Sequence, residues 1–297
     1  AQARQATATA VLEQETLLRM PVVPERHLSD QQRYRMAKLD ALREAGMNPY
    51  PVSVPRTHQI AEVVEGIEGD ISISGRVVRL RDLGGVTFAV LRENSQEVQV
   101  MVTSDRPQSN PEQFTHLVDL ADTISVTGNV TRSRTGELTV HAASWVMASK
   151  ALTPPPDKFK GLTDADTRLR LRHVDLALNE APTKLLKDRS TAIWAMRNAF
   201  AKHDFIEVET PILQPIHGGA NARPFTTHIN AYDMDVYLRI APELFLKRLA
   251  VGGFQRIFEI GRNFRNEGVD YKHNPEFTSV EAYQAYADYN TMRELTV

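Results

Sequence analysis

The segment from Asp70 to Lys150 constrains the fold more than any other part of the chain. It contains five short runs with apolar residues at alternate positions: DISISGRVVRLRDLGG, VTFAVLREN, EVQVMVT and the two runs of DTISVTGNVTRSRTGELTVHAASWVMA. Alternation with a period of two is typical of half-buried strands, and Gly, Asn and Ser turns separate these runs. Five such strands predict a small closed barrel, with PEQFTHLVDLA as a short capping helix.

A Greek-key barrel of the OB type fits this pattern. OB barrels bind single-stranded nucleic acid by stacking bases on aromatic rings beside cations, and Phe88 with Arg76, Arg79 and Arg81 supplies that combination. The pattern alone slightly favours the other interpretation, in which Phe88 is core and the arginines only face water. The formal net charge is -2, so any nucleic-acid binding has to come from a local patch.

Residues 1–58 are predicted to form a helical N-terminal extension. In SDQQRYRMAKLDALREAG, Ser29 is a candidate N-cap with Gln32 in the capping-box position, and Gly46 is a stop signal. The helix either packs on a neighbouring domain or presents a phosphate-binding face. Packing is favoured, because charged runs on a helix usually just face solvent. The basic residues concerned are Arg33, Arg35, Lys38 and Arg43.

A proline-rich joint, LTPPPDKFKGLTD, divides the chain. It predicts a barrel domain at 59–150, a linker at 151–165 and a second domain at 166–297. In the second domain, predicted strands and helices do not alternate regularly as in βαβ units, which indicates an antiparallel sheet. The whole chain is therefore predicted to be an α+β multidomain protein. The chain has no Cys, which excludes disulfides, a thiol nucleophile and thiolate zinc sites.

The stretch from Phe258 to Thr278, FEIGRNFRNEGVDYKHNPEFT, gives the strongest chemical signal. Its apolar alternation predicts a strand that ends near Arg265, a charged turn, and a returning strand after Pro275. One face of the returning strand is predicted to carry Phe277, Ser279, Glu281 and Tyr283. The other face is expected to belong to the core and carries Thr278, Val280 and Ala282.

The first of these faces suits a compound ligand. A guanidinium at Arg265 can hold a carboxylate or phosphate by two parallel hydrogen bonds. A ring at Phe277 can stack on a purine, and a dry carboxylate at Glu281 needs a cation, with Tyr283 adding a directed hydrogen bond. The alternative interpretation is that the charged residues of this face only form weak ion pairs at the surface. Glu243, in the first turn of a predicted helix, is equally well explained by the helix dipole and by a ligand.

These motifs resemble those of the class II aminoacyl-tRNA synthetases. FEIGRNFRNEG with HNPEFTSVEAY resembles motif 2, and FIEVETPIL resembles the end of motif 1, with Pro211 as the motif proline. GGANARPFTTH and YLRIAPELFLKRL are similar to the lysyl members in particular. The resemblance implies an OB-fold anticodon-binding domain, a class II catalytic domain with an antiparallel sheet, and a homodimer with Pro211 at its interface.

The resemblance also implies ATP-dependent activation of L-lysine to lysyl-adenylate, followed by transfer to tRNA(Lys). Arg265 would be catalytic and would hold the α-phosphate of ATP and the lysine carboxylate. The other implied ATP-binding residues are Glu267, His273, Asn274 and Phe277. The other implied lysine-binding residues are Gly219, Glu243, Glu281 and Tyr283. The implied anticodon-binding residues are Arg76, Phe88, Gln99 and Glu137.

Lysine is favoured within the subclass by the chemistry of the pocket. Aspartyl relatives need a cation to meet a substrate carboxylate, whereas Glu281 and Tyr283 suit an ammonium. An aspartyl or asparaginyl enzyme is the alternative. Motif 3 and the acidic residues that bind Mg²⁺ just before it are not found in this sequence. Both are expected beyond Val297, and no metal ligand is predicted within the chain.

Two further alternatives follow from the ends of the sequence. The helical lead-in and the first residue, Ala1, suggest the synthetase part of a fusion that supplies lysyl-tRNA for lysyl-phosphatidylglycerol synthesis. A non-catalytic tRNA-binding paralogue would lack motif 3 altogether. We expect a cytoplasmic location, with membrane association only if a transmembrane domain precedes Ala1.

Overall fold

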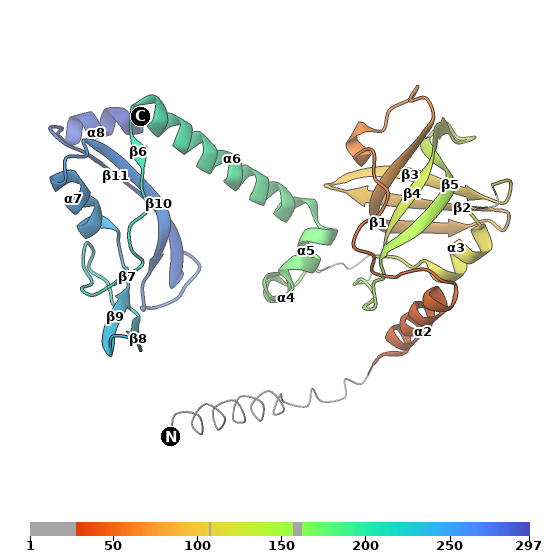
Figure 1. Ribbon diagram of the computed structural model, residues 1–297, viewed down its shortest axis with the longest axis horizontal. Helices are drawn as coiled ribbons and strands as arrows, with labels where there is room; N and C mark the ends of the chain where they lie inside the picture. The colour runs from red at the N-terminus through yellow and green to blue at the C-terminus, as the bar shows by residue number, and fades with distance from the viewer. Residues whose placement is uncertain (1–27, 107, 157–161) are drawn as a thin grey trace, which may run out of the picture. The chain divides into compact units, whose positions relative to one another are not determined.

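The computed structural model describes residues 28–106, 108–156 and 162–297. Within them the chain forms two compact units, one that ends at Glu180 and one that runs from Ala181 to Val297 (Figure 1). The first 27 residues of the predicted N-terminal extension lie outside the described residues.

A closed five-stranded barrel forms the first unit, as the alternating pattern predicts (Figure 1). Its strands follow the order β1-β2-β3-β5-β4, and their inward-pointing side chains make one apolar core. The elements are η1 (Ile60–Glu62), β1 (Asp70–Asp82), β2 (Val86–Glu93), β3 (Gln96–Thr103), α3 (Pro111–Leu117), β4 (Thr123–Arg132) and β5 (Leu138–Ser149). The predicted OB-type barrel and the short helix between its third and fourth strands are confirmed.

Helix α2 (Asp30–Glu44) begins at the predicted capping box. Ser29 Oγ accepts a hydrogen bond from the Gln32 amide at 3.2 Å, and the Ser29 amide donates to Gln32 Oε1 at 2.9 Å. Arg35 and Lys38 are buried, and the Arg35 guanidinium donates to the carbonyl oxygens of Leu120 and Ala151. The helix therefore packs on the barrel as expected, but Arg35 and Lys38 take part in that contact and do not face solvent as the prediction assumed.

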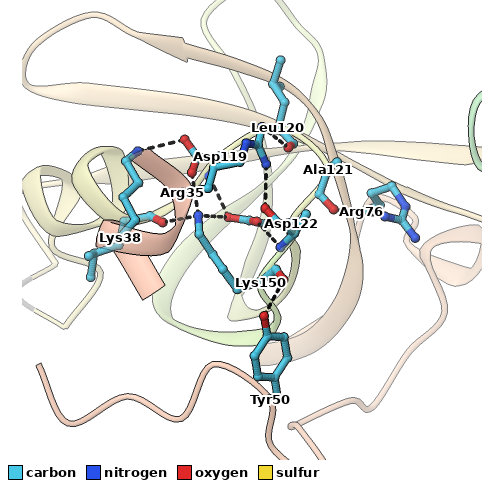
Figure 2. A network of polar contacts seen from close by, with 11 residues as sticks. Arg35, Lys38, Tyr50, Arg76, Asp119, Leu120, Ala121, Asp122 and Lys150 are labelled. Atoms are coloured by element: carbon cyan, nitrogen blue, oxygen red, sulfur yellow. Dashed lines mark hydrogen bonds and ion pairs between the residues drawn. The ribbon is translucent and has the colours of Figure 1, made fainter. Parts of the chain in front are cut away.

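A buried charge cluster holds α2, α3 and the end of β5 together (Figure 2). Lys150 Nζ lies 2.6 Å from Asp119 Oδ2, 2.8 Å from Asp122 Oδ2 and 2.9 Å from the Leu117 carbonyl oxygen. Lys38 Nζ reaches the other oxygen of Asp119 at 2.9 Å. Burial raises the pKa of Asp122, whereas for Asp119 the hydrogen bonds from Lys150 and Lys38 outweigh burial and lower the pKa.

The second unit contains two three-stranded sheets, ordered β11-β10-β6 and β7-β9-β8. Its strands are β6 (Ile206–Glu207), β7 (Leu213–Gln214), β8 (Thr226–Ile229), β9 (Met234–Leu238), β10 (Arg256–Phe264) and β11 (Glu276–Gln284). FIEVETPIL is predicted to be a strand that meets Pro211 at an edge or a chain reversal, and its two ends pair as β6 and β7 in different sheets. Pro211 lies between them and has no amide hydrogen to donate, which explains the interruption.

Five helices occur from residue 162 onward: α4 (Ala165–Arg170), α5 (Arg172–Leu178), α6 (Glu180–Lys202), α7 (Glu243–Val251) and α8 (Tyr289–Thr296). The long helix α6 packs on the β10–β11 hairpin through Phe200, whose ring stacks on that of Phe258 at 4.3 Å. The prediction that Thr278, Val280 and Ala282 are core is wrong, since Val280 is 40% exposed and the other two are half-buried. Beside them, α6 supplies a polar contact from Arg189 to Thr278 at 3.1 Å.

Candidate active site

The β10–β11 hairpin forms the floor of the candidate site (Figure 1). The two strands pair without a register shift, so Asn263 lies opposite Phe277, Gly261 opposite Ser279, and Glu259 opposite Glu281. Paired residues of neighbouring strands point to the same side of a sheet. The predicted parity is therefore correct, and one face carries aromatic, acidic and amide side chains in a row.

One end of this face combines a cation with an aromatic ring. Cζ of Arg265 lies 5.0 Å from the centre of the Phe277 ring, and the Arg265 amide donates to the Pro275 carbonyl at 2.8 Å. Nε of Arg265 is buried and has no hydrogen-bond partner among the described residues. The structure thus brings together the residues predicted to bind phosphate and adenine.

The other end of the face is acidic. Tyr283 donates a hydrogen bond from its hydroxyl to Glu281 Oε2 at 3.2 Å. Burial raises the pKa of Glu281, and the carboxylates of Glu243 and Glu259 raise it further. The pKa of Tyr283 is also raised, by burial first and then by Glu281 and Glu243. Negative charges this close together favour the binding of a cation. A bound cation would stabilise the Glu281 carboxylate and so lower its pKa.

Gly219 lies directly against Glu243, which opens helix α7. Its φ of +86° belongs to the left-handed region, and a Cβ there would come within 2.7 Å of Glu243 Cβ and 3.1 Å of Ala241 Cβ. Glycine is needed at this position for both reasons. The loop and the helix start predicted to bind the lysine ammonium are therefore neighbours, and Glu243 itself pairs with Lys247 at 2.6 Å.

A buried ion pair beside the acidic end of this face was not predicted from the sequence. Arg239 and Glu259 are 2% and 4% exposed, and Arg239 Nη1 lies 2.5 Å from Glu259 Oε1. Thr210 donates to the other oxygen of Glu259 at 2.7 Å, and Arg239 Nε donates to the Arg262 carbonyl at 2.8 Å. These bonds join the motif 1-like segment, β9 and β10. Glu259 has the parity of Glu281, but no sequence pattern identifies Arg239 as its partner.

The turn between β10 and β11 holds the remaining predicted nucleotide contacts. Glu267 accepts a hydrogen bond from the Arg223 amide at 3.1 Å, beside an open hollow of about 460 Å³ lined by Arg223, Asn266, Glu267 and Gly268. His273 is exposed and its Nδ1 lies 2.8 Å from Asp270 Oδ2, which lowers the pKa of Asp270. Asn274 is exposed in the same turn.

The predicted anticodon-binding residues fall into two places on the barrel. Gln99 donates to Glu137 Oε2 at 2.7 Å, and Phe88 lies on the neighbouring strand opposite Met101. Arg76 is farther along β1, where it pairs with Arg92 and donates to the Ala121 carbonyl at 3.0 Å. Phe88 instead lies opposite Arg81, so that Arg81 rather than Arg76 is the cation beside the ring.

Neither metal nor membrane features are found in the described part of the chain. No group of three or more His, Cys, Asp or Glu side chains there could hold a metal ion, so we assign no magnesium ligand. None of the helices there is long and apolar enough to cross a bilayer.

Comparison with known proteins agrees with this architecture. Residues 164–297 match the family of class II tRNA synthetases (D, K and N), and residues 71–148 match the OB-fold nucleic acid binding domain. The chain therefore carries a class II tRNA synthetase domain, preceded in the sequence by an OB-fold domain.

The chain is similar to several proteins that are named as bifunctional. Relatives from Mycolicibacterium vanbaalenii and Nocardia farcinica are 54% and 51% identical over 265 residues each, which is 89% of this chain. A relative from Gordonia bronchialis is 53% identical over 271 residues, or 91% of the chain. All three are called lysylphosphatidylglycerol biosynthesis bifunctional protein LysX, and the chain spans 24% of the length of each.

Proposed function

We propose that this protein activates L-lysine with ATP and transfers the lysyl group to tRNA(Lys). The observation that supports this most is the polarity of the β10–β11 face, with Arg265 and Phe277 at one end and Glu281 and Tyr283 at the other. The four residue steps from Phe277 to Glu281 span roughly 13 Å along a strand. That length separates a stacked base from a bound side-chain ammonium and leaves the phosphate and carboxylate between them.

In the first step, the lysine carboxylate attacks the α-phosphorus of ATP. A new oxygen–phosphorus bond forms, and the bond to the bridging oxygen breaks as pyrophosphate leaves. Arg265 stabilises the charge that grows on the phosphate oxygens, and no covalent enzyme intermediate is needed. A hydroxyl at the end of the tRNA then attacks the carbonyl of the adenylate, and AMP leaves.

Lysine specificity rests on the acidic end of the face. Glu281 accepts the side-chain ammonium, the Tyr283 hydroxyl orients the Glu281 carboxylate, and Glu243 beside Gly219 takes the α-ammonium. An aspartate or asparagine side chain offers no positive charge to this group of carboxylates. Aspartyl or asparaginyl activity is therefore the weaker alternative.

The test is lysine-dependent exchange between pyrophosphate and ATP in the full-length protein. We expect exchange with lysine and not with aspartate or asparagine, and a loss of about 10²–10³ in kcat for Arg265→Ala. Glu281→Gln should raise KM for lysine more than KM for ATP, because it alters only the cation-binding end. Exchange that survives without Arg265 would contradict the assignment, and tRNA binding without any exchange would point to a non-catalytic paralogue.

The barrel is proposed to bind the tRNA anticodon through Phe88, Gln99 and Glu137, with Arg81 beside the ring. A homodimer is proposed through the segment around Pro211, where Ile206, Ile212 and Leu213 are 52%, 42% and 46% exposed. Partner contacts would cover this apolar surface. Sedimentation analysis of the full-length protein tests the dimer, and Phe88→Ala should weaken tRNA(Lys) binding without changing pyrophosphate exchange.

A second function is favoured by the names of the relatives, which are described as bifunctional proteins of lysylphosphatidylglycerol biosynthesis. We propose that the lysyl-tRNA made here supplies lysine to a lipid, so that a cytoplasmic synthetase unit works at a membrane. Full-length protein with labelled lysine, tRNA and phosphatidylglycerol vesicles tests this. Label that stays on tRNA and never reaches lipid would exclude the second function and leave the first intact.

A further inference from the structure

We propose that Asn263 is a positioning residue for Arg265: its side-chain oxygen accepts a hydrogen bond from Arg265 Nε when substrate binds and so aims the guanidinium at the reacting phosphate. The inference rests on the proposed function and names a residue that the motif resemblance did not single out. It begins from two buried polar atoms on one face of β10.

Asn263 is 2% exposed, and its Oδ1 is buried without a hydrogen-bond partner among the described residues. Its Nδ2 donates to Ser279 Oγ across the strand pair at 2.6 Å. A buried acceptor that stays unpaired is costly, so such atoms usually meet a donor in some functional state. On this face the amide lies opposite Phe277 and two residues before Arg265.

Arg265 carries the complementary atom. Its Nε is a buried donor without a partner among the described residues, while its Cζ lies 5.0 Å from the Phe277 ring centre. In this arrangement the guanidinium covers the face of the Phe277 ring on which a purine would stack. Side chains two residues apart on a strand point the same way, so Nε of Arg265 can reach Oδ1 of Asn263 by side-chain rotation alone.

That rotation has a direct consequence for the site. It would free the Phe277 ring for the base and turn the two terminal nitrogens of Arg265 away from that ring. A hydrogen bond between Arg265 Nε and Asn263 Oδ1 would also give each of these two buried atoms a partner. Binding of the nucleotide and alignment of the catalytic cation are thus coupled through Asn263.

The experiment measures kcat and KM for ATP in lysine-dependent pyrophosphate exchange by the full-length protein. Asn263→Ala removes the acceptor and should lower kcat about 10- to 100-fold, as loss of an outer-sphere orienting partner does elsewhere, with KM for ATP within about threefold of wild type. Asn263→Asp keeps an acceptor oxygen and should retain kcat within about fivefold. A merely structural role would give equal losses in both variants.

The decisive measurement is a double-mutant cycle with Arg265→Lys, since lysine has no Nε. If Asn263 acts through that atom, adding Asn263→Ala to Arg265→Lys should cost no further activity. Equal losses in both backgrounds, or a change in KM for ATP alone, would overturn the proposal and indicate a direct contact with ligand. No exchange in the wild type would instead contradict the proposed function itself.

Gln214→Leu is the matched control. Gln214 is fully buried in the other sheet, and its Oε1 also lacks a partner within the described residues. Its Nε2 donates to the Pro211 carbonyl at 3.0 Å. It therefore reports what the loss of a buried amide does to the fold, and its fall in kcat should be smaller than that of Asn263→Ala. A fall in kcat equal to that of Asn263→Ala would contradict the specific role of Asn263.

Discussion

Two clusters of polar side chains, one in each unit, differ in how completely they are paired. In the barrel, Lys150 has three acceptors, and its partners Asp119 and Asp122 have further donors (Figure 2). On the β10–β11 face, Asn263 Oδ1 and Arg265 Nε have no partner in the part of the chain that the structure describes, and Glu281 lies close to two other carboxylates.

The difference separates a structural role from a binding role. Buried charges that satisfy one another stabilise a packing arrangement, and nothing in them awaits a ligand. Buried groups that lack partners, or that repel one another, lower stability and persist where a substrate will complete them. The Arg239–Glu259 pair is the intermediate case, because it is fully bonded and lies on the same face as the site.

The largest expected effect is on the barrel cluster. Lys150→Met leaves Asp122 buried without its cation and should cost about 3–5 kcal/mol of unfolding free energy. Combining it with Asp122→Asn should recover part of that loss. Urea unfolding followed by the fluorescence of Trp145, which is 5% exposed in the barrel, measures this in a Trp194→Phe background.

Lys184→Met is the control for the barrel cluster, because Lys184 and Asp188 form an ion pair at 2.5 Å with 76% and 58% exposed side chains. Exposed pairs contribute little, so no measurable change is expected. If Lys150→Met were as mild as this control, the cluster would not stabilise the barrel, and the contrast between the two units would fail.

A smaller effect is expected at the glycine beside Glu243. Gly219→Ala and Gly136→Ala impose the same backbone strain, with φ of +86° and +84°, but only the first places a Cβ against a neighbour. Gly136→Ala should cost about 1 kcal/mol and Gly219→Ala about 2–3 kcal/mol. Thermal unfolding gives both values, and KM for lysine should rise only for Gly219→Ala. If both substitutions lowered the free energy of unfolding equally, the loop at Gly219 would be able to move without disturbing Glu243.

The smallest effect depends on pH. Because burial raises the pKa of Glu281, the folded state favours its neutral form, and that stabilisation is lost as pH rises through the raised value. Glu281→Gln should therefore leave stability unchanged below the ordinary glutamate pKa and raise it by less than about 1 kcal/mol at neutral pH. Melting temperatures between pH 4 and pH 8 test this prediction.

Glu276→Gln provides the comparison for Glu281. Glu276 lies on the same strand with the opposite parity, and it is exposed in a 3.2 Å pair with Arg262. Its replacement should change neither the pH profile of stability nor KM for lysine. A stability gain that is the same at every pH in Glu281→Gln would contradict the like-charge explanation.

Local periodicity predicted much of the fold. The period-two runs of the barrel, the Ser29–Gln32 capping box and the parity of β11 follow from backbone geometry alone. Prediction failed where distant parts of the chain decide burial. Val280 has the pattern of a core residue but is 40% exposed, because burial depends on what packs above a strand.

The amino-acid sequence by itself determined the strand faces and the set of chemical groups that each face presents, since side-chain direction depends only on the local backbone. Only the tertiary structure decided which groups meet: Arg239 with Glu259, Gly219 with Glu243, and Lys150 with two aspartates. Those partners are between 20 and 31 residues apart in the chain, with Lys150 and Asp119 the most distant. No short-range pattern encodes such contacts, because chain topology and packing bring them together.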